Sequence, residues 1–107
     1  MKRYAGKSEP GAGGPGEVRV YGDTKHGRAL RPRNDLANHS PDGFQWGYGG
    51  SGPAQLALAL LADATGDDEF ALRHHQAFKF AVVAGLPAAW VLDEDQIRRW
   101  AEGEVMA

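Results

Sequence analysis

The most apolar stretch of the chain covers residues 54–64, where only Gln55 and Asp63 are polar. A helix that is apolar around its whole circumference is a buried helix. Its many alanines would also let neighbouring backbones approach closely. The pattern therefore predicts a central core helix over residues 53–65.

The flanks of this stretch carry helix start and stop signals. Pro53 suits the first turn, where its missing N–H costs nothing, and either Ser51 or Gly52 can serve as the N-cap. Gly66 can end the helix in the left-handed conformation.

A second helix is predicted over residues 67–85, with carboxylates in its first turn and Gly85 and Pro87 at its end. Residues at nearly helical spacing indicate which side is buried. They are Phe70, His74, Ala77, Phe78 and Ala81.

A third, shorter helix is predicted over residues 93–102. Asp93 followed by Gln96 has the spacing of a capping box. This helix is expected to bury Ile97 and Trp100.

Alternating polar and apolar residues predict a strand over residues 17–21, and short strands are also predicted over residues 2–7, 28–32 and 89–92. Residues 8–16 contain four glycines and two prolines, which predicts a flexible turn. A small antiparallel meander of this kind needs helices on one face. We therefore predict one α+β domain over residues 1–107, with the meander packed on a helical hairpin and a short C-terminal helix.

Composition narrows the class of protein. The 107 residues include no cysteine, which excludes disulfides and thiolate metal sites. No apolar run approaches the length of about 18 residues that spans a membrane, and the N-terminal sequence lacks the apolar segment of a secretory signal. We expect a cytoplasmic protein without a membrane partner.

Charge is divided unevenly along the chain. Residues 1–52 hold eight Lys/Arg and five Asp/Glu, whereas residues 53–107 hold four and nine, which together give the net charge of −2. The basic residues are scattered among glycines, so we do not expect direct nucleic-acid binding. An acidic half is better suited to a basic protein surface, although ordinary solvation also explains it.

Residues 38–53 form an unusual loop, with the sequence NHSPDGFQWGYGGSGP. Asp42-Gly43 favours a tight turn. The dense glycines imply positive φ angles or close backbone contacts. Phe44, Trp46 and Tyr48 alternate with small or polar residues and are expected to fold back and close one end of the core.

The same loop enters a helix N-terminus, so it could instead hold an anion or a phosphate. That site would consist of Gly49, Gly50, Ser51 and Gly52. The loop lacks the lysine of a P-loop, and its glycine–serine segment does not fit the G-x-S-x-G nucleophile elbow.

The histidines give little sign of catalysis or of metal binding. His74 and His75 are adjacent, so on a helix they point about 100° apart and do not easily share one metal ion. His39, Ser40 and Asp42 match a catalytic triad only in composition, because neighbours in a turn seldom have triad geometry. We expect His39 to bond a backbone group and so fix the loop, and His74 to lie at the edge of the core. The sequence implies no cofactor and no metal.

The block from Asn38 to Gln55, followed by the apolar helix, resembles the signature of a family of small uncharacterised domains found in phages, plasmids and bacterial genomes. The resemblance extends more loosely over residues 17–100. It implies short N-terminal strands followed by helices, and a role in the contest between phage and host, with no established activity.

These observations lead to three hypotheses. The first is a non-enzymatic phage-type inhibitor that occupies the nucleic-acid-binding surface of a host CRISPR effector complex. The second is a nucleotide- or nucleic-acid-binding module that uses the glycine-rich loop, or a structural domain. The third is an enzyme centred on His39 and Ser51. The first hypothesis assigns partner contacts to Trp46, Tyr48, Asp67, Asp68, Glu69, Asp93, Glu94 and Asp95.

Overall fold

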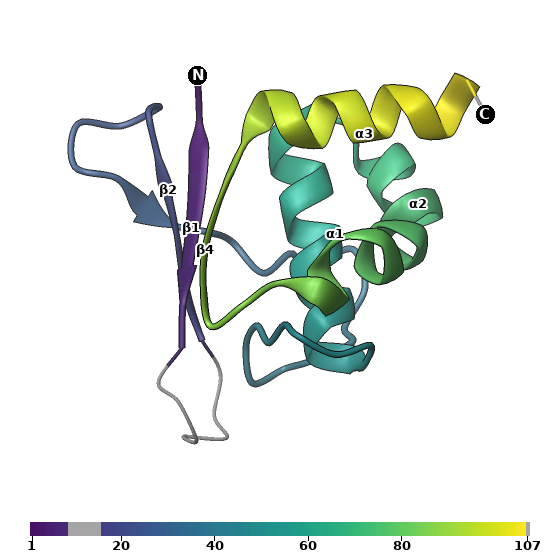
Figure 1. The fold of residues 1–107 in the computed structure, drawn as a ribbon, viewed down its shortest axis with the longest axis horizontal. Helices are drawn as coiled ribbons and strands as arrows, with labels where there is room; N and C mark the ends of the chain where they lie inside the picture. The colour runs from purple at the N-terminus through teal and green to yellow at the C-terminus, as the bar shows by residue number, and fades with distance from the viewer. Residues whose placement is uncertain (9–15, 107) are drawn as a thin grey trace.

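A computed structural model describes residues 1–8 and 16–106 as a sheet covered on one side by helices (Figure 1). The strands are β1 (Arg3–Lys7), β2 (Glu17–Tyr21), β3 (Arg28–Ala29) and β4 (Ala89–Asp93). The helices are α1 (Ser51–Thr65), α2 (Asp68–Ala81) and α3 (Glu94–Met106), with a 3-10 turn, η1, over Val83–Gly85. The predicted α+β class is confirmed.

The sheet is antiparallel throughout, in the order β3-β2-β1-β4. The predicted strand at 89–92 thus joins the meander beside β1. The third strand is shorter than the predicted 28–32, because only Arg28 and Ala29 pair with β2. Tyr4, at the centre of the sheet, lies opposite Val20 on one side and Leu92 on the other.

The predicted turn over residues 8–16 falls mostly on residues 9–15, which lie outside the described part of the chain. At its two ends, Ser8 N donates to Ala88 O at 3.0 Å and Gly16 N donates to Phe44 O at 2.9 Å. The first bond ties the end of β1 to the residue that precedes β4. The second ties the start of β2 to the loop that precedes α1.

Helix α1 is the centre of the core, as predicted. It lies between the sheet and α2 (Figure 1), and its four leucines have no exposed surface. The N-cap is Gly50 and neither Ser51 nor Gly52, since Gly50 is extended and its carbonyl accepts the first helical bond from Ala54 N at 3.0 Å. Gly66 ends the helix at φ +69°, as expected.

Helix α2 departs from the prediction in its length and in its buried side. Its regular part ends at Ala81, where η1 continues the chain in place of a helix to residue 85. Ala71 and His75 are buried, whereas Ala77 and Ala81 are exposed. The buried side is therefore rotated from the predicted one, although His74 does lie at the core edge, stacked on Phe70.

The predicted capping box of α3 is present. Gln96 N donates to Asp93 Oδ1 at 2.7 Å, and Asp93 N donates to Gln96 Oε1 at 2.8 Å. The helix continues to Met106, beyond the predicted end at residue 102, because Gly103 takes part in the helix and does not end it.

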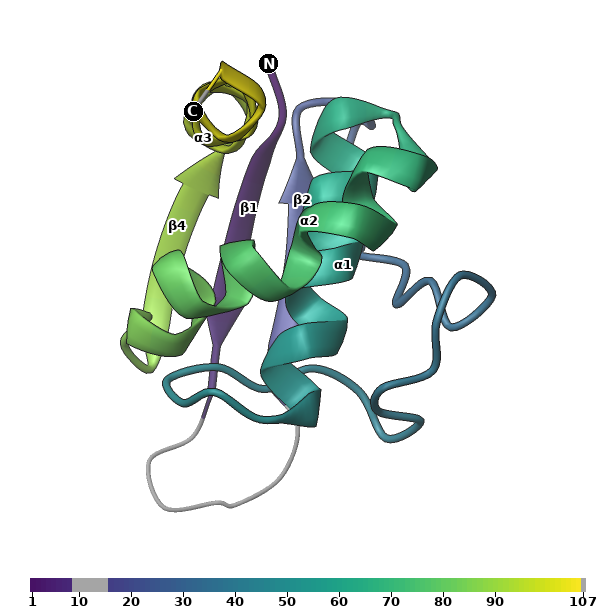
Figure 2. The same ribbon diagram turned by 90° about the vertical axis from the view of Figure 1, so that its right-hand side faces the viewer.

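Helix α3 crosses over the end of the helical hairpin, and in Figure 2 it is seen nearly end-on beside β1 and β4. Ile97 and Ala101 are buried, and the half-buried Trp100 meets Phe78 of α2 edge-to-face, with ring centroids 4.9 Å apart. None of the helices in residues 1–8 and 16–106 is long and apolar enough to cross a membrane.

Candidate functional site

The start of the loop at residues 38–53 is pinned to α1 by one buried amide. Gln55 has no exposed surface. Its Oε1 accepts from His39 N at 2.8 Å and from Ser40 N at 3.2 Å, and its Nε2 donates to Pro32 O at 2.6 Å. Both the oxygen and the nitrogen of the Gln55 amide are hydrogen-bonded, so the start of the loop is held in one position against α1.

His39 also joins the loop to α2 through its ring, because His39 Nε2 lies 2.9 Å from His75 Nε2. His75 Nδ1 faces two carbonyl oxygens, those of Ala71 and Leu72, at 3.0 and 2.9 Å. Carbonyls only accept, so His75 carries its proton on Nδ1 and its Nε2 accepts from His39. His39 thus fixes the loop as expected, although its ring contacts the His75 side chain and not a backbone group.

The pKa of His39 is held below its ordinary value. Burial disfavours the charged imidazolium, and the neighbouring His75 and Lys79 disfavour it further. The contact between His39 and His75 therefore holds the loop while His39 is neutral. Neither Ser51 nor Asp42 is hydrogen-bonded to His39 within the described residues.

The three loop aromatics have three different environments. Phe44 is buried in the core. Trp46 is half-buried, donates from Nε1 to Pro87 O at 2.8 Å and meets Trp90 edge-to-face at 5.6 Å. Tyr48 is 48% exposed, so the expectation that all three close the core is wrong for Tyr48.

Tyr48 and Phe80 of α2 form an exposed aromatic surface around the glycines of the loop. The Tyr48 ring lies against Gly50, and a Cβ at Gly49 would be 3.0 Å from the Phe80 ring. Phe80 is 67% exposed, and Lys79 Nζ lies 4.1 Å from its ring centroid. We call these residues the Tyr48–Phe80 surface.

Sequence reasoning missed Phe80, although a signal was present. Phe78 and Phe80 are two positions apart, so on a helix their side chains point about 200° apart. One of them had to face solvent, and Phe78 is the buried one.

The proposed anion-binding residues Gly49 to Gly52 lie at the N-terminus of α1. None of the four has a positive φ, which in this loop occurs at Gly43 and Gly47. They are small because neighbouring side chains are close: a Cβ at Gly52 would be 2.7 Å from the Gln45 side chain. Gln45 in turn accepts a hydrogen bond from the Tyr48 hydroxyl.

The acidic cluster before α2 is mostly engaged within the molecule. Asp67 caps α2 by accepting from Phe70 N at 3.0 Å. Asp68 pairs with Arg33 at 2.8 Å, and that bond lowers the pKa of Asp68. Glu69 is exposed and belongs to no ion pair or side-chain hydrogen bond of the described residues.

The acidic cluster before α3 is engaged in the same way. Asp93 is part of the capping box. Glu94 accepts from the backbone N of Lys2 at 2.7 Å and pairs with Arg98 at 3.3 Å. Asp95 is exposed and belongs to no ion pair or side-chain hydrogen bond of the described residues.

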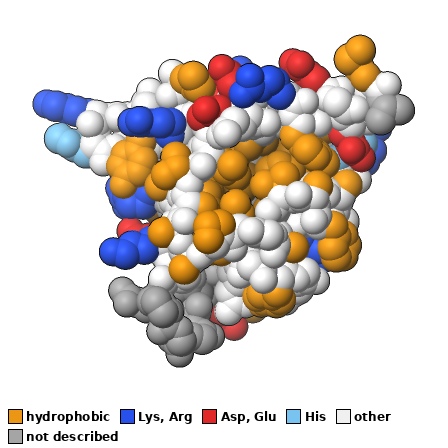
Figure 3. Space-filling view, viewed as in Figure 1, with side chains coloured by type: hydrophobic (Ala, Val, Ile, Leu, Met, Phe, Trp, Pro, Cys, Tyr) orange, Lys and Arg blue, Asp and Glu red, His pale blue; other side chains and the backbone are white. Residues whose placement is uncertain are grey.

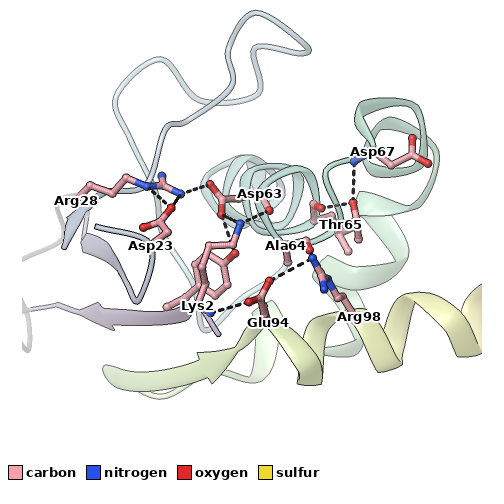
Figure 4. A network of polar contacts seen from close by, with 11 residues as sticks. Lys2, Asp23, Arg28, Asp63, Ala64, Thr65, Asp67, Glu94 and Arg98 are labelled. Carbon is pink, nitrogen blue, oxygen red and sulfur yellow. Dashed lines mark hydrogen bonds and ion pairs between the residues drawn. The ribbon is translucent and has the colours of Figure 1, made fainter. Parts of the chain in front are cut away.

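A second polar network surrounds Asp63 at the other end of α1 (Figure 4). Its carboxylate accepts from Lys2 Nζ at 2.9 Å, from the Tyr4 hydroxyl at 2.7 Å and from Arg28 Nη2 at 2.8 Å. Burial alone would raise the pKa of Asp63, but these three donors outweigh it and lower the pKa. The network fastens β1 and β3 to α1.

Tyr4 shows the opposite effect in the same network. Burial, and then its hydrogen bond to Asp63, raise the pKa of the Tyr4 hydroxyl far above its ordinary value. Tyr4 therefore stays a neutral donor, and the network is structural. Within residues 1–8 and 16–106, no three His, Cys, Asp or Glu side chains gather closely enough to hold a metal ion.

The fold and this surface define a small α+β protein with a loop tethered by hydrogen bonds and exposed aromatic rings beside it. The chain belongs to a family of unknown function, DUF6166, whose model matches residues 11–103. No curated protein and no solved structure matches the chain significantly.

Proposed function

We propose that the protein is a non-enzymatic binding protein that meets a macromolecular partner through the Tyr48–Phe80 surface. The main supporting observation is that the pinned loop places exposed Tyr48 next to its glycines, which also lie against exposed Phe80 of α2, where Lys79 packs over the Phe80 ring. Rigid aromatic side chains give large contact area at low entropic cost, and they are frequent hot spots of interfaces.

The proposed partner is a host defence complex whose nucleic-acid-binding surface is basic, most concretely a CRISPR effector. The resemblance to domains of phages and plasmids supports this choice, as does the acidic balance of residues 53–107. Of the six carboxylates assigned to this contact, Glu69 and Asp95 are the ones free to act without disturbing the fold. Complementary charge of this kind mainly accelerates association.

The test uses a purified CRISPR effector complex from the organism in which the protein is found. It measures how tightly that complex binds its target DNA. Adding the protein is expected to reduce DNA binding. The double variant Tyr48→Ala, Phe80→Ala should weaken inhibition at least tenfold, because hot-spot truncation costs about 2 kcal/mol or more. Glu69→Lys with Asp95→Lys should slow association, and more so at low salt.

The matched control is Leu72→Ala, which removes another exposed apolar side chain of α2. It should leave inhibition unchanged. Absence of inhibition by the unaltered protein, or equal losses in the control and the double variant, would overturn the proposal.

A further inference from the structure

The face of the sheet that points away from α1 is not covered by any described element. All three helices lie on the opposite side (Figure 1). Side chains alternate along a strand, so the buried Tyr4, Val18, Val20 and Trp90 face inward. The outward face consists of Arg3, Ala5, Lys7, Glu17, Arg19, Tyr21, Ala29, Ala89, Val91 and Asp93.

The outward face carries three cations and has a positive balance among the described residues. Arg3, Lys7 and Arg19 form no ion pair with the described residues. In Figure 3, Lys and Arg side chains gather along the left side, where the sheet lies. Two carboxylates of the described residues reduce this charge: Glu17 lies opposite Lys7, and Asp93, which also caps α3, lies opposite Arg3.

The fold gathers these cations from distant positions. Register places Arg19 beside Ala5, and Arg3 beside Tyr21. The small Ala5 leaves a shallow hollow of about 290 Å³ between the longer side chains, lined by Ala5, Gly6, Lys7, Glu17, Arg19 and Tyr21. This grouping was not visible in the sequence, where the same residues are scattered.

Tyr21 adds a supported aromatic ring to the basic face. It is 38% exposed. Gly27 packs against the ring, since a Cβ there would be 2.7 Å from two ring carbons, and Gly27 has φ +76°. The ring is thus held from one side by the turn between β2 and β3.

We propose that the outward face of β1 and β2 binds single-stranded nucleic acid, with Arg3, Lys7 and Arg19 contacting phosphates and Tyr21 stacking on a base. Cations that follow the backbone and an aromatic platform are the two parts of such sites. An exposed ring can stack on a base only where that base is free of a duplex stack, so the face suits a single strand. This site is separate from the Tyr48–Phe80 surface.

The test measures fluorescence anisotropy of labelled dT12 and U12 oligonucleotides with the full chain at 50 and 200 mM salt. Three phosphate contacts predict a slope of about −2 for log affinity against log salt, or about 20-fold weaker binding at the higher salt. Tyr21→Ala should weaken binding about 5- to 150-fold, and Tyr21→Phe should retain it. Preference for U12 or dT12 decides between RNA and DNA.

The charge test compares Arg19→Glu with the control Arg99→Glu. The control changes the net charge by the same amount at an exposed position of α3. Arg19→Glu should weaken binding at least tenfold, and Arg99→Glu less than twofold. No binding at 50 mM salt, or equal effects of the two reversals, would overturn the proposal. So would binding of an oligo-glutamate peptide in preference to both oligonucleotides, because the face would then serve an acidic protein.

Discussion

At the scale of single residues, Gln55 and Asp63 decide how the rest of the chain is attached to α1. They are the two polar residues of an otherwise apolar stretch, and each binds segments that are far away in the sequence. Gln55 holds the loop, and Asp63 holds two strands. A helix with no such residues would be buried equally well but would not specify which segments lie against each end.

Replacing the carboxylate of Asp63 should therefore be costly. In Asp63→Asn, an amide N–H would face the Arg28 guanidinium, and Lys2 would lose its counter-charge. We expect the free energy of unfolding to fall by about 2–3 kcal/mol, measured by urea denaturation at pH 7. Asp23→Asn, which removes the exposed partner of Arg28, should cost much less. Comparable losses in both variants would contradict the central role of Asp63.

His39 makes stability depend on pH. His39 has an ordinary pKa of 6.5, which the fold lowers. The unfolded chain thus binds the proton more readily, and stability is complete above about pH 6.5 and declines as pH falls toward the lowered pKa. Urea denaturation at pH 7.5, 6.5 and 5.5 should show this decline, and His39→Gln should reduce it. An unchanged pH dependence in that variant would mean that other groups cause the loss of stability at low pH.

At the scale of elements, the sequence predicted a helix correctly where the side chains themselves indicate its burial or its start. The continuous apolar run predicted the buried α1, and the Asp93–Gln96 spacing predicted the start of α3. The N-cap of α1 was missed because Gly50 caps through its backbone alone. The buried side of α2 was missed because His75, a polar residue, becomes buried by bonding to carbonyls of its own helix.

The candidate site was predictable only in part, for a physical reason. The loop residues Trp46 and Tyr48 were identified from local composition. Their neighbours Phe80 and Pro87 come from α2 and the segment after η1, and their contact depends on how the helices pack. Local propensity carries no information about such long-range contacts.

The capping box offers a test at the element scale. Asp93→Ala removes the acceptor for Gln96 N and should lower the free energy of unfolding by about 1 kcal/mol. Asp95→Ala, which removes a first-turn carboxylate without a capping bond, should have a smaller effect. Thermal denaturation followed by circular dichroism measures both. Equal shifts in melting temperature would indicate that only the helix dipole matters.

At the scale of the whole molecule, the uneven charge along the chain becomes an uneven charge in space. Residues 1–31 contribute Lys2, Arg3, Lys7, Arg19, Lys25, Arg28 and Arg31, and they supply β1 to β3. Residues 53–107 hold most of the acidic residues and supply the helices and β4. A net charge of −2 therefore conceals two regions of opposite sign.

We expect this separation to give the protein an electric dipole whose positive end lies toward β1 to β3. Near a polyanion, the sheet would turn toward the polyanion before any specific contact forms. Near a polycation, the helices would turn toward it instead. At low ionic strength the same molecule should consequently be retained by both cation- and anion-exchange resins, a behaviour that its isoelectric point alone would not suggest.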